Sequence, residues 1–304
     1  MLGMGWIRKG NIFNECHAQV PVVDINHDGF WRIYYSKREN RGPSLPYYLD
    51  VEAGNPHKIL GHSPGPILNP GNKGMFDWAG VMPTEIIQVG DVRYLYYIGW
   101  ANRIDVPYHN NLGLAISHDQ GQTWKKYSDG PVFATSAKEP GYVGTISIIK
   151  KDELYYGYYL SCRQWREHEG RMEPMYDIKI ATSENLIDWL PLNQSAVLLE
   201  NQEGGISKAS VLQIGQEYFL WFAVRNAVDY RDNPANSYRI KCAKSDDLLH
   251  WQRTDELGLD IDLKSTWENN MVEYPHVIAY QNQIFMFYNG NGFGETGFGY
   301  AVLS

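Results

Sequence analysis

The chain has 304 residues and a formal net charge of −8, and its basic residues are dispersed rather than gathered in one tract. This charge balance gives no support to nucleic-acid binding. No stretch reaches the roughly 18 consecutive apolar residues that a membrane-spanning helix needs, and residues 1–13 contain no apolar run of signal-peptide length. We therefore expect a cytoplasmic protein with neither a nucleic-acid partner nor a membrane partner.

The cysteines point to the same compartment. Cys16, Cys162 and Cys242 are far apart in the sequence, and three is an odd number. Such a set argues against a disulfide framework and against a zinc site. We expect a reducing environment, no obligatory metal and no other cofactor.

Strand signals run along the whole chain. Alternating Tyr, Phe, Val and Ile, bounded by Gly, Asp and Asn, predict units that begin with an apolar strand, continue with an aromatic strand and add a third. The first unit is expected at 19–25 and 31–36, with further strands near 47–51 and 57–60. The later units are expected at 81–88, 93–99 and 112–117; at 143–149, 154–160 and 177–182; at 207–214, 218–223 and 239–245; and at 272–280, 284–289 and 297–303.

A tryptophan-marked phrase follows three of these units. It reads Ser-His-Asp-Gln-Gly-Gln-Thr-Trp at 117–124, and shorter versions return at 183–189 and 245–251. A fixed period of about sixty residues is typical of repeat architectures, in which a single unit cannot bury its own faces. The phrase predicts a β-propeller, and we expect Asp119, Thr123 and Trp124 to be structural.

The last unit lacks a fourth strand, and the N-terminus can supply it. Residues 6–13 resemble 124–127 together with 130–133. We predict that the first dozen residues complete the last blade by backbone hydrogen bonds, which removes two exposed sheet edges. The sequence therefore predicts an all-β fold, a single domain over 1–304 that forms a five-bladed β-propeller, with its ring closed by the N-terminal strand.

One face of such a propeller gathers polar groups. The first and second strands of a blade are antiparallel, so the start of the first and the end of the second open on the same face. Among these first-strand groups, His17 suits contact with a substrate hydroxyl, proton transfer or a structural core position, and His276 suits a central water or ion, or a structural hydrogen bond. The candidates from the first strands are Asp77, Glu203 and Glu273 for catalysis and Glu15, His17, Gln19, Lys208 and His276 for substrate binding.

The ends of the second strands add a second set. Three of the five equivalent positions are arginines, whose planar guanidinium suits bidentate recognition of a carboxylate or phosphate, although ion pairs that fix loops are an equal alternative. Long loops at 101–111, 164–176 and 226–237 open on this face and are expected to wall a pocket. The five residues at these strand ends, all candidates for substrate binding, are Arg38, Trp100, Arg163, Arg225 and Asn291.

With these features the chain resembles the five-bladed β-propeller glycoside hydrolases and their relatives, the arabinanase, fructosidase and β-mannoside phosphorylase group. The phrase at 117–124 also matches the Asp-box of sialidases, a structural marker found in many propellers. Glu273, in Val-Glu-Tyr-Pro, resembles the general acid of the group, although it stands in the fifth blade rather than an earlier one. The Asp that precedes Pro in the first blade of those enzymes is replaced here by Val20.

The resemblance implies cleavage of a glycosidic bond by carboxylates at the central mouth. Hydrolysis ordinarily uses two carboxyl groups, and we select Asp77 and Glu273 as the pair, with Glu203 and Glu15 next. Arg38, Arg163 and Arg225 would hold an acidic group of an oligosaccharide or glycoconjugate, and Trp100 would stack on a sugar.

Three alternatives remain open from the sequence. A glycoside phosphorylase would use the arginines for phosphate and keep one acid. A non-catalytic carbohydrate-binding propeller would have lost the acid and base. A sialidase would use the arginines as a carboxylate clamp, and five blades instead of six count against it.

Overall fold

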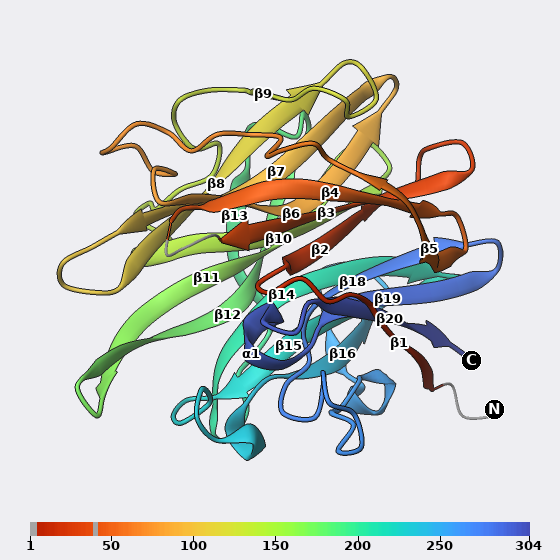
Figure 1. Cartoon of the computed structure of the whole chain (residues 1–304). Coiled ribbons are helices and arrows are strands. Elements are labelled where there is room, and N and C mark those ends of the chain that lie inside the picture. Colours follow the sequence, from red (N-terminus) through yellow and green to blue (C-terminus); the bar gives the residue numbers. More distant parts are fainter. Residues whose placement is uncertain (1–4, 39–41) are drawn as a thin grey trace.

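The computed structural model describes residues 5–38 and 42–304. Their regular secondary structure is almost all β-strand (Figure 1). The helical segments within this part of the chain are short: η1 (Pro234–Asn236), η2 (Asp255–Leu257) and α1 (Asn291–Gly294). No helix of the described ranges is both long enough and apolar enough to cross a membrane.

The strands form three sheets. The first contains β2 (Gln19–Asp24), β3 (Phe30–Arg38), β4 (Ser44–Glu52), β5 (Asn55–His62), β6 (Gly80–Val89), β7 (Val92–Asn102), β8 (Tyr108–Ser117) and β9 (Lys125–Lys126). The second contains β10 (Tyr142–Lys151), β11 (Leu154–His168), β12 (Arg171–Ser183), β13 (Leu190–Val197), β14 (Glu203–Ile214), β15 (Glu217–Asn226), β16 (Arg239–Ser245) and β17 (Gln252–Arg253). The third contains β1 (Trp6–Phe13), β18 (Glu273–Tyr280), β19 (Gln283–Asn289) and β20 (Phe298–Leu303).

Each eight-stranded sheet is made of two antiparallel runs of four strands. The two runs meet at a single parallel pair, Ser44 with Gly80 in the first sheet and Tyr176 with Gly205 in the second. Most strands lie close to where the alternating sequence pattern predicts them, because side-chain alternation and turn residues are local signals. The segment 164–176, predicted as a long loop, is instead the continuation of β11 and β12 into a hairpin that turns between His168 and Arg171.

The N-terminal strand pairs with the C-terminal strand. β1 runs antiparallel to β20, with Trp6 opposite Leu303 and Phe13 opposite Phe298 (Figure 1, dark red beside dark blue). The ends of the chain therefore belong to one four-stranded sheet, as the similarity between residues 6–13 and 124–133 predicted.

The first strands of the four-stranded runs lie against one another in sequence order. β2 contacts β6, β6 contacts β10, β10 contacts β14, β14 contacts β18, and β18 contacts β2. Side chains bridge several of these contacts: the Ser147 hydroxyl accepts a hydrogen bond from the backbone N–H of Val211 at 3.1 Å, and the Ser210 hydroxyl accepts one from Val277 at 2.8 Å. The starts of these strands consequently converge, which gathers their side chains at one place.

The repeated phrase forms a tight turn. The Ser117 hydroxyl accepts a hydrogen bond from the Gly121 N–H at 2.8 Å, and the Asp119 carboxylate accepts one from the Thr123 N–H at 2.9 Å. These bonds hold the turn, in agreement with the structural role predicted for Asp119 and Thr123.

Each repeated tryptophan then packs edge-on against a tyrosine in the second strand of the preceding run. Edge-on aromatic pairs of this kind add stability beyond the area they bury, so the sixty-residue period has its physical origin in packing between neighbouring runs. The pairs and their ring-centroid distances are Trp124 with Tyr34 at 5.7 Å, Trp189 with Tyr96 at 6.1 Å and Trp251 with Tyr158 at 5.2 Å.

Candidate active site

A cavity of about 530 Å³, here called the central cavity, opens where the first strands begin. Aromatic side chains form much of its wall, and polar side chains come from several of the strand starts and long loops. The aromatic residues of the lining are Trp100, Tyr108, Tyr142, Tyr176, Tyr230, Tyr238, Tyr274 and Phe293, and its charged or strongly polar residues are His17, Gln19, Arg38, Asn102, Asn110, Ser207, Arg231 and Glu273.

Glu273 is the most unusual group in this cavity. Its side chain is buried, its Oε1 accepts a hydrogen bond from the Ser207 hydroxyl at 3.1 Å, and its Oε2 has no partner in the described ranges. Burial raises the pKa of Glu273 to about 8, against the lowering effects of the Ser207 hydrogen bond, the charges of Arg225 and Arg231, and the neighbouring Tyr274 hydroxyl. Burial therefore favours the protonated form of this carboxyl.

The backbone at Glu273 is strained. Tyr274 has a φ of 55°, and Val20, the residue before Pro21 in β2 as Tyr274 is before Pro275 in β18, has a φ of 56°. This left-handed conformation costs of order 1–3 kcal/mol for a non-glycine residue and often marks a functional site. Both strands have an irregular register here, between Gln19 and Val22 and between Glu273 and His276. Such bulges re-aim side chains, and the residues preceding the two strained positions, Gln19 and Glu273, both line the central cavity.

The aromatic wall is a connected cluster. Trp100 packs against Tyr108 with ring centroids 4.8 Å apart, and Tyr108 packs against Tyr142 at 5.7 Å. On another side the hydroxyls of Tyr176 and Tyr238 are hydrogen-bonded to each other. A wall that combines aromatic faces with hydroxyl groups suits a ligand with apolar faces and polar edges.

Two arginines, Arg225 in β15 and Arg231 in the loop at 226–237, stabilise another part of the wall. Arg231 lines the cavity and donates to the Tyr230 hydroxyl at 2.6 Å, and the Tyr230 hydroxyl donates to Glu173. Burial acts to raise the pKa of Glu173, but the hydrogen bonds from Tyr230 and Arg231 outweigh it and the pKa is lowered. Arg225 lies behind this wall, with its guanidinium 3.9 Å from the centre of the Tyr230 ring. These contacts tie the loop to the β11–β12 hairpin.

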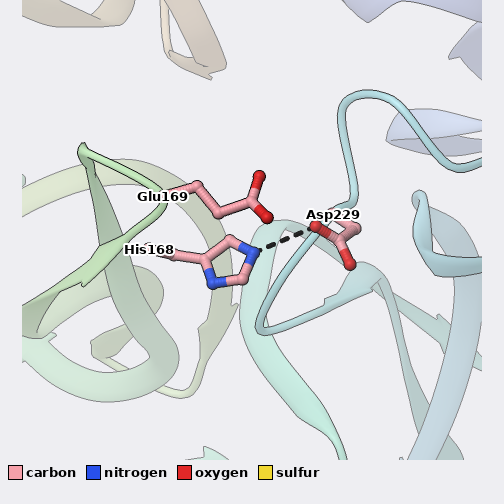
Figure 2. Close-up of side chains that lie close together, drawn as sticks. All are labelled: His168, Glu169 and Asp229. Atoms are coloured by element: carbon pink, nitrogen blue, oxygen red, sulfur yellow. Dashed lines mark hydrogen bonds and ion pairs between the residues drawn. The ribbon is translucent and has the colours of Figure 1, made fainter.

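The tip of that hairpin and the segment after β15 together carry the one group of three side chains in the described ranges whose geometry suits a metal ion. His168, Glu169 and Asp229 each offer a ligand atom within 4.8 Å of the others. Figure 2 shows the His168 imidazole directed at the Asp229 carboxylate, which it meets at 3.0 Å. The hydrogen bond between His168 and Asp229 accounts for this contact, and the absence of an obligatory metal stays a prediction.

The structure brings part of the predicted site together. His17, Gln19, Arg38, Trp100 and Glu273 all line the central cavity. The other predicted residues lie elsewhere.

Asp77 lies in a different hollow, beside Lys126. Its Oδ2 accepts hydrogen bonds from Lys126 Nζ at 2.5 Å and the Tyr97 hydroxyl at 3.3 Å, and its Oδ1 accepts one from the Gly71 N–H at 3.1 Å. The predicted pair of Asp77 and Glu273 therefore does not share one cavity. Lys126, Tyr97 and the Gly71 N–H hold the Asp77 carboxylate outside the central cavity, which Glu273 lines.

Asp77 belongs to a repeated structural arrangement. In two other runs a buried carboxylate again accepts from a tyrosine 20 residues later, Glu139 from Tyr159 at 2.7 Å and Glu268 from Tyr288 at 2.7 Å. Each is also paired with a cation: Lys179 lies 2.9 Å from Glu139 and Arg8 lies 3.3 Å from Glu268.

Glu203 and Glu15 are also held by cations. Arg253 donates to both oxygens of Glu203 at 2.9 Å, and Glu203 lines a hollow outside the central cavity. Glu15 is exposed and accepts from Lys37 at 3.1 Å. Neither carboxylate lines the central cavity.

Arg163, Arg225 and Asn291 do not line the central cavity either. Arg163 donates to Asp177 and to the Ser195 hydroxyl. Asn291 accepts from the backbone N–H groups of Asn270 and Met271, at 2.8 and 3.1 Å. These contacts fix strands and loops around the cavity, and the contact of Arg163 with Asp177 is an ion pair of the kind that the sequence left open as an alternative role for the arginines.

Lys208 and His276 are buried and do not contribute to the cavity lining. Burial lowers the pKa of Lys208 to about 8, although the charge of Glu85 opposes this shift. Burial, with the charge of Lys208 second, lowers the pKa of His276 well below its usual value. The sequence could not show whether these side chains reach the central cavity or lie buried below it. Alternation predicts the face of the strand on which a side chain lies, but not how far that side chain is from the cavity.

Sequence reasoning did not select Tyr176, Tyr230, Arg231 or Tyr238, all of which line the cavity. The available signal was the mixture of charged and aromatic residues in the loops at 164–176 and 226–237. That mixture predicted a wall but did not indicate which side chains face it.

Solved structures with the same fold include a glycosyl hydrolase from Bacteroides ovatus, with a TM-score of 0.72 and 16% identity over 96% of this chain and 85% of that one. A structure of the GH130 family of mannoside phosphorylases, which contains glycoside hydrolases that target β-1,2 mannosidic linkages in Candida mannan, has a TM-score of 0.69 and 18% identity over 98% of this chain and 85% of that one. The fold is that of the glycoside hydrolase-like propeller enzymes, and the resemblance seen in the sequence is confirmed.

Two relatives with higher sequence identity define the family of the chain. Uncharacterized protein MT1551 of Mycobacterium tuberculosis (strain CDC 1551 / Oshkosh) is 34% identical over 313 residues, which cover 99% of each chain. Uncharacterized protein Rv1502 of Mycobacterium tuberculosis (strain ATCC 25618 / H37Rv) is 35% identical over 315 residues, again 99% of each. The chain belongs to the family of these two proteins. No family model matches its sequence.

Proposed function

We propose that this protein cleaves a glycosidic bond in an oligosaccharide or glycoconjugate, with Glu273 as the general acid. The observation that carries the proposal is the state of Glu273: a buried carboxyl in an aromatic cavity, with a pKa of about 8 and with Oε2 unpartnered in the described ranges. A general acid works best when its pKa lies near the working pH.

The surroundings of Glu273 suit proton donation. The Ser207 hydroxyl donates to Oε1 and so favours a carboxyl whose proton is on Oε2, the oxygen without a partner. That proton would pass to the glycosidic oxygen as the bond to the anomeric carbon breaks. The carboxylate left behind would be stabilised by the Ser207 hydrogen bond and by the charges of Arg225 and Arg231.

The fate of the glycosyl group divides hydrolysis from phosphorolysis. Among the described residues that line the central cavity, Glu273 is the single carboxyl group. Hydrolysis ordinarily needs a second carboxyl to activate water or to attack the sugar. Phosphate carries its own nucleophilic oxygen and needs no such base.

A cation in the lining favours phosphorolysis as the second candidate. Arg38 lines the central cavity and has no ion pair or side-chain hydrogen bond within the described part of the chain. Its guanidinium suits bidentate binding of a phosphate. Arg231 and His17 add further donors to the same cavity.

Product analysis tests the proposal. Wild-type protein and Glu273→Gln are incubated with neutral and acidic oligosaccharides, with and without inorganic phosphate. We expect wild-type turnover and its loss in Glu273→Gln; free sugar would indicate hydrolysis, and a sugar phosphate formed only with phosphate would indicate phosphorolysis. Saturable binding without turnover would contradict the proposal and assign the protein to the sugar-binding propellers.

The number of domains and blades is also part of the proposal. We infer one domain with five four-stranded blades, one of which is the β1–β20–β19–β18 sheet that joins the two ends of the chain. The cyclic order of contacts between the first strands supports a closed ring. Deletion of residues 1–13 is expected to destabilise the fold strongly, and a variant that unfolds at the wild-type denaturant concentration would contradict closure by β1.

We also propose a cytoplasmic location. The support is that all three cysteines are free, including the buried Cys162 and Cys242. Fractionation of cells that produce the native chain is expected to recover it with cytoplasmic markers, and recovery in an extracellular fraction would contradict the proposal.

A further inference from the structure

A second hollow of about 590 Å³, here called the outer groove, lies at the same end of the sheets as the central cavity. Glu203 at the start of β14 lines the outer groove, and Ser207 in the same strand lines the cavity. Met175 and Tyr176 are consecutive in β12, and they line the groove and the cavity respectively. Because successive side chains of a strand point to opposite faces, the Met175–Tyr176 part of β12 separates the two hollows.

The outer groove has one uncompensated positive charge. Arg163 is balanced by its ion pair with Asp177, and Glu203 is balanced by Arg253. Arg166 also lines the groove, is exposed, and has no ion pair or side-chain hydrogen bond in the part of the chain that the structure describes. In a protein with a formal net charge of −8, an unpaired guanidinium in a hollow favours an anionic ligand.

Carboxamides supply the other polar groups of the groove. The side chains of Gln164, Asn201 and Gln202 line it and have no hydrogen-bond partner in the described ranges. Each carboxamide offers two donors and one acceptor oxygen, which match the hydroxyl groups of a sugar. Met175 and Leu199 add apolar surface for the C–H face of a ring.

We propose that the outer groove binds an anionic sugar unit, a pyranose that carries a carboxylate or a sulfate ester, while another part of the same glycan occupies the central cavity. The role of the groove in catalysis rests on the proposed function. Arg166 binds the anion through its guanidinium fork, and Gln164, Asn201 and Gln202 bind the hydroxyls. The substrate is therefore an acidic oligosaccharide or polysaccharide longer than one sugar, with its charge recognised away from the cleaved bond.

Calorimetric titration of the Glu273→Gln variant tests this assignment, because the variant is expected to leave the glycan uncleaved. The probes are a galacturonic acid tetramer, a sulfated galactose tetramer and a neutral galactose tetramer. We expect at least one acidic tetramer to bind about tenfold or more tightly than the neutral one, the size expected for a hydrogen bond to a charged group. The two acidic probes distinguish a carboxylate from a sulfate ester.

A second substitution in the same background locates the binding. Arg166→Ala is expected to remove the preference for the acidic tetramer. Arg166→Lys keeps the charge without the fork, so it is expected to keep part of the preference. The matched control is Arg171→Ala, since Arg171 is an exposed arginine of the same hairpin that lies outside the groove; it is expected to change the preference less than about twofold.

Three results would overturn the assignment: equal or no binding of acidic and neutral tetramers, an unchanged preference in Arg166→Ala, or an equal loss in Arg171→Ala. Failure of the proposed function gives a different result. If wild-type protein cleaved no glycan while the acidic preference depended on Arg166, the catalytic proposal would be contradicted and the anionic site would stand.

Discussion

Asp77 and Glu273 are equally buried, each with 1% of its surface exposed, but their partners differ. Asp77 accepts from a lysine, a phenol and a backbone N–H group. Glu273 accepts from one hydroxyl and keeps an unpartnered oxygen beside a cavity. Burial alone does not separate a structural carboxyl from a catalytic one. The number and charge of the donors differ: Asp77 has a cation and two further donors, whereas Glu273 has one hydroxyl donor and burial raises its pKa.

The internal repeat sharpens this comparison. The arrangement of Asp77 returns at Glu139 and Glu268, with a tyrosine and a cation each time. Glu273 has no acidic counterpart: Gln19, which also lies two residues before a proline in a first strand, is an amide. In a repeat protein, a buried polar group that recurs in several repeats stabilises the fold of each repeat. A buried polar group that occurs in one repeat alone is the stronger candidate for a catalytic residue.

The largest expected effect is the loss of turnover in Glu273→Gln. General acid catalysis contributes about 10²–10⁴-fold to rate, so kcat on an identified substrate is expected to fall by about that factor. The amide keeps the shape of the side chain, and circular dichroism is expected to show an unchanged fold. Turnover within about threefold of wild type would show that Glu273 is not the acid.

A large effect on stability is expected for Asp77→Asn. The substitution removes the charge that pairs with Lys126, and leaving a buried polar group poorly satisfied costs about 1–3 kcal/mol. Urea unfolding at neutral pH measures this loss, with Glu139→Gln as a matched member of the repeat. The kcat of the folded variant is expected to stay within about threefold of wild type; a loss comparable to that of Glu273→Gln would restore Asp77 to the catalytic site.

The pH dependence of turnover is expected to follow the protonation of Glu273. The acid must be protonated to donate, so kcat is expected to fall as pH rises through the pKa of about 8. Folded protein also holds this proton more tightly than the unfolded chain does. Stability is therefore expected to decline as pH rises from the ordinary glutamate pKa of 4.5 towards 8, and Glu273→Gln removes that contribution. A rate that keeps rising from pH 8 to pH 10 would contradict this.

The smallest effect is expected for Ser207→Ala. The hydrogen bond from Ser207 lowers the pKa of Glu273, so its removal is expected to move the alkaline fall in kcat to higher pH while the acid group remains. A pH–rate profile of the variant beside wild type measures the shift. A shift to lower pH would mean that the hydroxyl stabilises the protonated form instead.

The sequence predicted the strands and the role of the repeated turn because both depend on neighbouring residues. It also selected Glu273, from its place at the start of a first strand and from the Val-Glu-Tyr-Pro context. It did not separate Asp77 from the site, because the lysine that holds Asp77 is 49 residues away and belongs to β9, beyond the reach of a local pattern. Arg231 was missed for the same reason, since its partner Glu173 lies 58 residues before it.

The central claim is that Glu273 is a neutral acid at neutral pH, and an NMR titration of side-chain carboxyl carbons in glutamate-labelled protein tests it most directly. We predict one signal with a midpoint of about 8 in wild type, absent in Glu273→Gln. If the signal that disappears in Glu273→Gln titrated below about 5, near the ordinary range for this side chain, Glu273 would be ionised at neutral pH, and its assignment as the general acid would be wrong.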